Sequence, residues 1–375
     1  MYIRDPIHTS IDFDEFQERV LNTKEMQRLR QIKQMGFCNL VYPGANNTRF
    51  EHCVGVMHVA RELEARVYDE PRPEVAYIGL LHDIGHGPFS HQSEPVIKKY
   101  LHKSHEQMGE DMVRNSEIKD ILNEAGLDLD FILGYFKDEM HCEIVGGALG
   151  ADRVDYLMRD SLYTGVAYGI IDYTRIKSKM ASYNGRPAIY EQGVSGAESL
   201  LIARYFMIKN VYMHHVELIA EGMFQNALIE AIDGGKLDPL QVHGLTDSAL
   251  LENLKGLEGA NGSVHRILGR RLFKRASYEL VGPELKREEV VSALEGLGLG
   301  TNDYVVYLGE LRGSMSDIAV VEKNGELVGN LSEISPLIKT LNNTLASERR
   351  LLVACDEKNR EKVSAAMDRL VKPAV

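Results

Sequence analysis

Histidine is concentrated in one part of this chain. Seven of the thirteen histidines lie between residues 52 and 105, where an even distribution would place about two. They are His52, His58, His82, His86, His91, His102 and His105. Because imidazole binds metal ions and exchanges protons near neutral pH, this excess points to a metal or phosphate site. Histidines on helix faces are often ordinary polar residues, so the count alone leaves both interpretations open.

The segment LLHDIGHGPFSH, residues 80 to 91, is the most informative part of this region. It predicts an apolar helix that ends on the pair His82 and Asp83, because glycine and proline follow at once. Adjacent helical side chains diverge by about 100°, so both can share one cation only in a crevice between helices. Two histidines and two carboxylates would suit Mn²⁺, Fe²⁺, Zn²⁺ or Ni²⁺ and leave positions open for water and a phosphate oxygen.

The elements that position these residues are predicted to be mostly helices. Residues Tyr2 to Asp12 mix β-branched residues with proline and predict a short strand or hairpin. Apolar residues then recur at helical spacing. The predicted helical segments are Phe13 to Met35, Val54 to Val67, Glu74 to Leu81, Glu106 to Leu122, Asp152 to Asp160, Ala197 to Ile232 and Ser263 to Tyr278. We therefore predict a mainly α fold with a short amino-terminal β element.

Beyond about residue 280 the sequence pattern changes. Residues Asp303 to Leu308 and Ile318 to Glu322 favour strands, and Lys323 to Glu326 is typical of a hairpin turn. The predicted helices Leu331 to Leu345 and Glu357 to Leu370 flank the apolar segment Leu351 to Ala354. We expect a helical catalytic domain over residues 1–280 and a small α+β domain over residues 281–375, with an oligomerisation or regulatory role.

Composition and charge exclude several classes of protein. With 375 residues, 44% of them apolar and 26% charged, the chain can bury a large core, which excludes wholesale disorder. The formal charge of −12 disfavours a protein that coats duplex nucleic acid or anionic lipid. A local channel of arginines would escape this argument, so binding of single-stranded nucleic acid stays open.

The chain shows no sign of export or of a redox framework. The first residues lack the basic segment and apolar run of a signal peptide, and no stretch approaches the ~18 apolar residues of a membrane span. We expect a soluble, cytoplasmic protein without a membrane partner. The four cysteines are far apart and form no CxxC pair, which indicates reduced core residues.

The order of these residues resembles the HD superfamily of metal-dependent phosphohydrolases, whose signature is H…HD…D. The resemblance implies a helical HD fold and one divalent cation per active site, with Mn, Fe, Zn, Ni or Mg as candidates. The implied ligands are His52, His82, Asp83 and Asp152, the first in RFEH and the last in DRVDY.

Several further stretches resemble the deoxynucleoside triphosphate triphosphohydrolase branch of that superfamily. They include DPIH at residues 5–8, MQRLRQIKQMG at 26–36, YPGA at 42–45 and HEQ at 105–107, and the resemblance covers roughly residues 1 to 220. It implies phosphate contacts by Arg49, Arg153 and Arg204 and sugar or base contacts by Gln34, Tyr156, Asp160 and Tyr212. The implied catalytic acid/base group is His86, His91, His105 and Glu106.

The resemblance implies hydrolysis of a deoxynucleoside triphosphate (dNTP) at the α-phosphorus, which gives a deoxynucleoside and triphosphate. Either His91 or His105 would protonate the leaving oxygen, and the sequence does not choose between them. One rival is an HD-type nucleotidase or phosphodiesterase acting on monophosphates or cyclic nucleotides. Another, from a different class, is a catalytically weak nucleotide-sensing scaffold.

Members of this branch often form oligomers that nucleotides activate at a subunit interface. We therefore expect a homo-oligomer, a dimer or a tetramer, with an activating nucleotide as a partner to be tested. Gln27 and Arg30 match the regulatory pattern. Asn22 stands where mammalian members have an acidic residue, and an amide lacks the carboxylate that pairs with two N–H groups of guanine.

Overall fold

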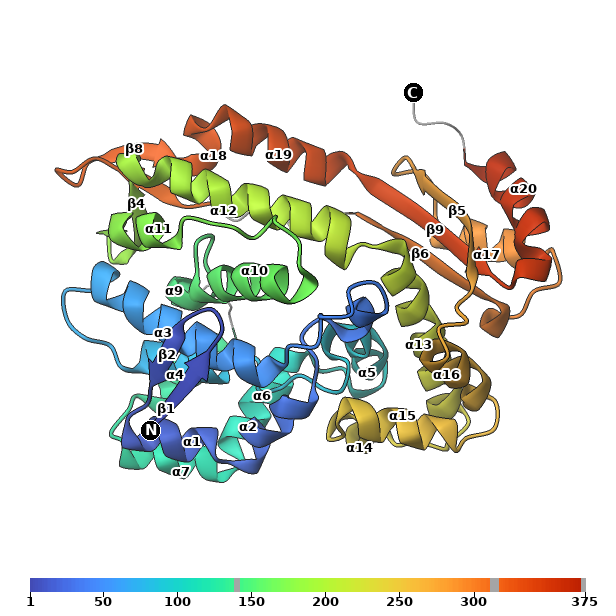
Figure 1. Ribbon diagram of the computed structural model, residues 1–375, viewed down its shortest axis with the longest axis horizontal. Coiled ribbons are helices and arrows are strands. Elements are labelled where there is room, and N and C mark those ends of the chain that lie inside the picture. The colour runs from blue at the N-terminus through green and yellow to red at the C-terminus, as the bar shows by residue number, and fades with distance from the viewer. Residues whose placement is uncertain (138–141, 311–316, 372–375) are drawn as a thin grey trace.

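The computed structural model describes residues 1–137, 142–310 and 317–371. Helices build most of the molecule, and strands gather at the amino end and along one long side (Figure 1). The helices are α1 (Glu15–Leu21), α2 (Lys24–Arg28), α3 (Arg49–Val67), α4 (Glu74–Leu81), α5 (Glu94–Leu101), α6 (His105–Arg114), α7 (Glu117–Glu124), α8 (Leu129–Tyr135), α9 (Glu143–Gly146), α10 (Ala151–Thr164), α11 (Tyr173–Lys179), α12 (Val194–Met207), α13 (His215–Asp233), α14 (Pro239–His243), α15 (Asp247–Lys255), α16 (Ala260–Leu268), α17 (Arg287–Glu295), α18 (Leu331–Ile334), α19 (Pro336–Ser347) and α20 (Arg360–Leu370). The strands are β1 (Tyr2–Asp5), β2 (Thr9–Asp12), β3 (Met180–Tyr183), β4 (Arg186–Tyr190), β5 (Lys274–Leu280), β6 (Tyr304–Glu310), β7 (Ala319–Val321), β8 (Leu327–Asn330) and β9 (Arg349–Cys355). This mainly helical fold, with an amino-terminal hairpin and a carboxyl-terminal α+β region, confirms the predicted fold class.

Helix α3 is the central element of the helical part. It begins at a capping box, in which the Thr48 amide donates to the Glu51 carboxylate at 2.7 Å and the Thr48 hydroxyl accepts from the Glu51 amide. The helix packs against α4 and α10, and it is buried around most of its circumference. Polar side chains on a helix that is covered on several sides are buried, so they need hydrogen-bond partners inside the protein. His52 of α3 is such a buried polar side chain.

The strands form three small sheets. Strands β1 and β2 make an antiparallel hairpin, and β5 and β6 flank β9 in an antiparallel sheet of order β5-β9-β6. The third sheet has the order β3-β4-β7-β8, and its central pair, β4 and β7, is parallel, with Ala188 opposite Ala319. This pair joins segments that are about 130 residues apart in the sequence.

The domain boundary expected near residue 280 stays a prediction. Residue 280 is the last residue of β5, and β5 pairs with β9 from the carboxyl-terminal segment. Strand β4 likewise pairs with β7 across the expected boundary. The segments on the two sides of residue 280 therefore share two sheets.

The expected boundaries of several long helices are wrong. The predicted helix Phe13 to Met35 is broken into α1, α2 and a 3-10 turn, because Asp14 and Thr23 each cap a new helix. The predicted helix Ala197 to Ile232 is interrupted by a π-helical turn, Ile208–Tyr212. The predicted helix Ser263 to Tyr278 ends at Leu268, and its last residues belong to strand β5.

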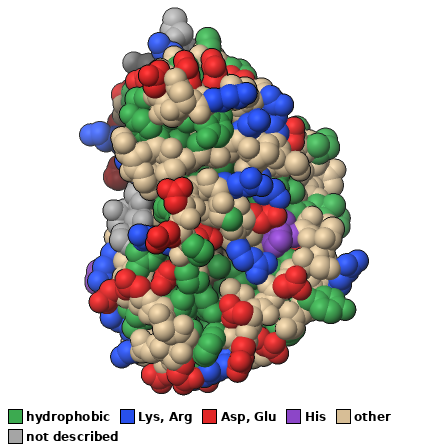
Figure 2. Space-filling view, turned by 90° about the vertical axis from the view of Figure 1, so that its left-hand side faces the viewer, with side chains coloured by type: hydrophobic (Ala, Val, Ile, Leu, Met, Phe, Trp, Pro, Cys, Tyr) green, Lys and Arg blue, Asp and Glu red, His purple; other side chains and the backbone are tan. Residues whose placement is uncertain are grey.

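Charged side chains of both signs are mixed on the surface. On the face shown in Figure 2, acidic and basic groups lie close together, and no broad basic area is visible among the described residues there. Among the described residues, no helix has both the length and the apolar character needed to cross a membrane.

Candidate metal centre and substrate pocket

Three of the predicted metal ligands converge from different helices. His52 comes from α3, His82 follows the last residue of α4, and Asp152 lies in the first turn of α10. The Nε2 atoms of the two histidines are 3.3 Å apart, and Oδ1 of Asp152 lies 3.1 Å from Nε2 of His52 and 3.8 Å from that of His82. Ligands at about 2.1 Å from one cation are separated by about 3.0–3.4 Å. The cluster is therefore consistent with a divalent metal.

Asp83 adjoins this cluster and also contacts an arginine. Its Oδ2 lies 3.4 Å from Nε2 of His82 and 3.7 Å from Nε2 of His52, and it forms an ion pair with Arg49. Burial favours the neutral acid, but the charges of Arg49 and the neighbouring histidines hold the pKa of Asp83 well below its usual value. Asp83 thus presents an ionised oxygen beside the cluster.

The electrostatic field of the cluster favours a cation. Burial lowers the pKa of His52, but hydrogen bonds to Asp152 and Asp155 raise it to about 10. Burial lowers the pKa of His82, which therefore stays neutral, as a metal ligand must be. The carboxylates thus stabilise positive charge at the point where the ligand atoms meet.

A second layer of polar residues holds His52, and the sequence analysis did not identify it. Oδ2 of Asp155 accepts from Nδ1 of His52 at 2.8 Å, and Oδ1 accepts from Nε2 of His8 at 2.7 Å. Arg159 donates to both oxygens at 2.9 Å and reaches Asp5 at 2.9 Å. Such a carboxylate fixes the ring orientation and tautomer of a metal-binding histidine. The signal in the sequence was the spacing of Asp155, three residues after Asp152 in DRVDY.

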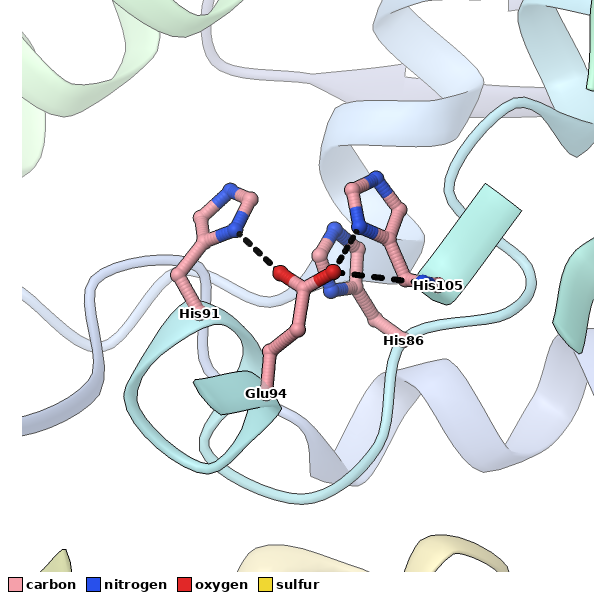
Figure 3. A group of neighbouring side chains, drawn as sticks. All are labelled: His86, His91, Glu94 and His105. Carbon is pink, nitrogen blue, oxygen red and sulfur yellow. Dashed lines mark hydrogen bonds and ion pairs between the residues drawn. The ribbon is translucent and has the colours of Figure 1, made fainter. Parts of the chain in front are cut away.

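The predicted acid/base residues form a second cluster beside the first (Figure 3). Glu94 lies between two rings, with Oε2 3.2 Å from Nδ1 of His91 and Oε1 2.7 Å from Nδ1 of His105. The ring of His86 stacks on His105 with centroids 4.0 Å apart. Nε2 of His86 also lies 3.3 Å from Oδ1 of Asp83, so that this carboxylate faces both clusters.

The histidines of the second cluster differ in their proton affinity. Burial lowers the pKa of His105, but the hydrogen bond to Glu94 and the charges of Glu94 and Glu106 raise it above its usual value. Glu106 Oε1 lies 3.1 Å from Nε2 of His105. Burial and the charges of Arg49 and His105 hold the pKa of His86 well below its usual value. The cluster therefore pairs an imidazole that holds its proton more strongly than usual, His105, with one that holds it less strongly, His86.

The loop between α4 and α5 carries His86 and His91 in a constrained shape. Phe89 and Ser90 have positive φ angles, 59° and 49°. Asp247 accepts from the Phe89 amide at 2.7 Å, and Arg28 donates to the His86 carbonyl at 2.6 Å. A Cβ on Gly85 would lie 2.0 Å from the His105 carbonyl oxygen, so only glycine fits there. The sequence did not reveal these supports.

A pocket of about 300 Å³ adjoins the two clusters. Arg49, His91, Tyr156 and Arg204 are among the residues that line it. The ring of Tyr156 lies 6.5 Å from that of His52, which places this part of the pocket next to the metal centre. Two of the three predicted phosphate-binding arginines, Arg49 and Arg204, thus line this pocket, and Arg49 also contacts Asp83 beside the metal centre.

The predicted sugar and base residues line the same pocket. They are Gln34, Tyr156, Asp160 and Tyr212. Tyr212 donates to Asp160 at 2.8 Å from the π-helical turn, and Asn47 donates to its other oxygen at 2.9 Å. Burial raises the pKa of Asp160 to about 6.

The remaining predicted residues lie outside the lining of this pocket. Arg153 donates to the Gly147 carbonyl at 2.5 Å. The predicted regulatory residues lie near α2, where Asn22 ends α1, Gln27 donates to the Leu21 carbonyl at 2.8 Å, and Arg30 donates to Gln27 at 2.9 Å. A nucleotide at this surface stays a prediction.

Comparisons with known proteins agree with this geometry. Residues 49–153 match the HD domain, and residues 171–372 match the HD associated region. The chain belongs to the family of HD-domain phosphohydrolases with an HD-associated region. It is 34% identical to the uncharacterized protein MJ1154 of Methanocaldococcus jannaschii over 100% of this chain and 82% of that protein.

Enzymes and solved structures also appear among the similar proteins. A protein of Dictyostelium discoideum named deoxynucleoside triphosphate triphosphohydrolase SAMHD1 homolog is 27% identical over 99% of this chain and 80% of its own length. The crystal structure of a hypothetical protein from Aquifex aeolicus is 28% identical, with a TM-score of 0.79 over 98% of this chain and 99% of that one. A phosphohydrolase structure from Bacteroides thetaiotaomicron is 25% identical, with a TM-score of 0.76 over 95% and 99% of the two chains.

Proposed function

We propose that this phosphohydrolase cleaves deoxynucleoside triphosphates at the α-phosphorus and releases a deoxynucleoside and triphosphate. The observation that carries the proposal is the pocket that joins Arg49 and Arg204 to Tyr156 and Asp160 beside the metal centre. Two arginines supply more positive charge than a single phosphate group requires. The similarity to the Dictyostelium homolog across nearly the whole chain supports the same reaction.

His52, His82, Asp83 and Asp152 would hold the cation, as their separations and charges fit one. A divalent cation at this position supplies Lewis acidity towards a phosphate oxygen and towards water. Arg49 couples the cation ligands to the substrate, because its guanidinium contacts Asp83 and also lines the pocket. It would hold a phosphate oxygen close to the reacting phosphorus.

The sugar end of the pocket would favour deoxyribose over ribose. The ring of Tyr156 would lie against the sugar, and a 2′-hydroxyl would have to fit against that ring. Oε1 of Gln34 is buried and has no hydrogen-bond partner within the described structure. A 3′-hydroxyl that donates to Gln34 would satisfy this acceptor, and Asp160 lines the pocket as an alternative partner for the same hydroxyl.

His91 would protonate the leaving 5′-oxygen. It lines the pocket, and Glu94 holds its Nδ1. His105 has both ring nitrogens next to carboxylates, those of Glu94 and Glu106. These contacts suit His105 for keeping a positive charge near Glu94 rather than for delivering a proton to substrate.

The test is incubation of metal-stripped protein with each dNTP and NTP, with and without Mn²⁺, Mg²⁺ or Fe²⁺, with products resolved by ion-exchange chromatography. Intact triphosphate and deoxynucleoside are expected from the dNTPs, and neither from an Asp83→Ala variant. His91→Ala should retain its metal and lose turnover. The matched control is His265→Ala, which replaces an exposed histidine on α16 and should keep the wild-type rate.

Other products would contradict the proposal. Release of pyrophosphate or orthophosphate from dNTPs would place cleavage at another bond. Turnover of monophosphates or cyclic nucleotides alone would favour a nucleotidase or a phosphodiesterase. Tight nucleotide binding without turnover of any substrate would favour a sensing scaffold.

A further inference from the structure

Two acidic residues line the same pocket as Arg49 and Arg204. Glu217 and Glu221, in the first two turns of α13, line it together with Gln92. Ring contacts lead from the metal centre along the pocket, since Tyr156 lies 6.5 Å from His52 and 6.3 Å from Tyr212, and both tyrosines line the pocket. The arginines attract a triphosphate, whereas the lining residues on α13, namely Glu217, Leu218 and Glu221, include no cation. A nucleotide would therefore place its phosphates at the arginines and its uncharged base beside Glu217.

Glu217 is a buried acid without a basic partner. Its exposed fraction is 7%, and within the described structure it forms no ion pair with lysine or arginine. Oε1 accepts from Nε2 of Gln92 at 2.9 Å, and Oε2 accepts from the thiol of Cys38. Burial raises the pKa of Glu217 well above its usual value. When Glu217 is protonated, its carboxyl group has one O–H to donate, and Glu217 lines the pocket.

Gln92 presents an unused acceptor next to this acid. Its exposed fraction is 6%, and its Oε1 is buried with no hydrogen-bond partner in the described part of the chain. The backbone carbonyl of Gln92 accepts from Gln225 at 2.8 Å. The amide also fills the space above Gly36, where a Cβ would lie 2.1 Å from Oε1. The amide is therefore fixed, and a buried acceptor left unpaired costs about 1–3 kcal/mol.

We propose that Gln92 and Glu217 form the edge that recognises the nucleobase. The amide oxygen of Gln92 accepts from an N–H of the base, and the carboxyl group of Glu217 donates to an adjacent ring nitrogen or carbonyl oxygen. The four bases present donors and acceptors at different positions, so this pair discriminates between them. The inference rests on the proposed function, because it assigns the base of the same nucleotide.

The test compares kcat/KM for the four dNTPs in wild-type protein and in Glu217→Met. Methionine has a similar volume and no hydrogen-bonding oxygen. We expect the ratio between the best and the worst base to change by about tenfold, the effect of one or two lost hydrogen bonds. Glu217→Gln should keep the wild-type ratio, because an amide offers the same donor and acceptor as a neutral acid. Equal losses for all four bases in Glu217→Met would overturn the inference.

A second measurement separates this inference from the proposed reaction. Binding of the four deoxynucleosides, measured by calorimetry, requires no turnover. A base preference that is present in the wild type and absent in Glu217→Met supports the inference even if no triphosphate is hydrolysed. Identical relative affinities in both proteins would refute it. Glu64→Met is the control for folding, since Glu64 is also buried, with an exposed fraction of 9%, and lies outside the lining of the pocket.

Discussion

Asp155 offers a sharp test of how the metal centre is held. The variant Asp155→Asn keeps the shape of the side chain and removes its charge. An amide NH₂ replaces one of the two oxygens that accept from His52, His8 and Arg159. One donor of Arg159 then faces another donor, and Nδ1 of His52 loses a charged partner or keeps a weaker one.

The size of the effect follows from these contacts. Loss of a carboxylate behind a metal-binding histidine typically costs 10–100-fold in metal affinity. Breaking a buried ion pair costs about 3–5 kcal/mol. Arg159 keeps its bond to Asp5 at 2.9 Å, so we expect the lower value, about 3 kcal/mol. For 375 residues, an unfolding entropy of about 2.1 cal/mol/K per residue converts this to a fall in Tm of about 4 °C.

Two measurements check the prediction for Asp155→Asn. Mn²⁺ titration of metal-stripped protein by calorimetry should show the weaker binding, and thermal unfolding of the metal-free protein should show the lower Tm. Asp128→Asn is the matched control, because Asp128 is an exposed N-cap of α8 and asparagine caps equally well. Wild-type Mn²⁺ affinity together with a lowered Tm would refute the positioning role and leave only a structural one.

Three further predictions follow from the same region. Because the pKa of Asp160 is raised to about 6, the side chain loses its negative charge below that pH, and KM for a dNTP should rise there. A pH series of KM should show this rise in the wild type and not in Asp160→Asn. Glu94→Gln removes the charge that raises the pKa of His105. An NMR titration should therefore show a lower pKa for His105, and turnover should drop about 10²-fold. An unchanged pKa of His105 in the variant would contradict this role of Glu94. A Cβ on Gly55 would lie 1.9 Å from Oδ1 of Asp155. Gly55→Ala should therefore lower the free energy of unfolding in urea by about 1–3 kcal/mol and weaken Mn²⁺ binding. Gly262→Ala is the control, because a Cβ there meets no atom within 4 Å, and it should change neither quantity.

The sequence predicted the parts of this molecule that local patterns encode. Helical spacing located α4 and most of α3, although the first residues of α3, from Arg49 to Cys53, were missed. The order of histidines and aspartates indicated the residues that converge from three helices. The phosphate, sugar and regulatory roles of individual residues stay predictions. Helix breaks were missed where a side chain caps a new helix inside a continuous apolar pattern, as Thr23 does.

Long-range partners could not be predicted from one sequence. His8 and Asp155 are 147 residues apart, and no periodicity links a residue near the amino terminus to a helix in the middle of the chain. The hairpin of β3 and β4 was missed because each strand is only four or five residues long. Strand β4 pairs with β7, which lies far downstream, so no local sequence pattern predicts that the two strands form one sheet.

The parallel pairing of β4 with β7 determines how this chain could be divided. A polypeptide ending at residue 280 would retain β3 and β4 but lose both β7 and β8, and the open edge of β4 would expose unpaired backbone amides and carbonyls. It would also leave β5 without β9, its neighbour in the other sheet. Such a fragment would be prone to self-association, because residues beyond 280 supply the strands that complete both sheets.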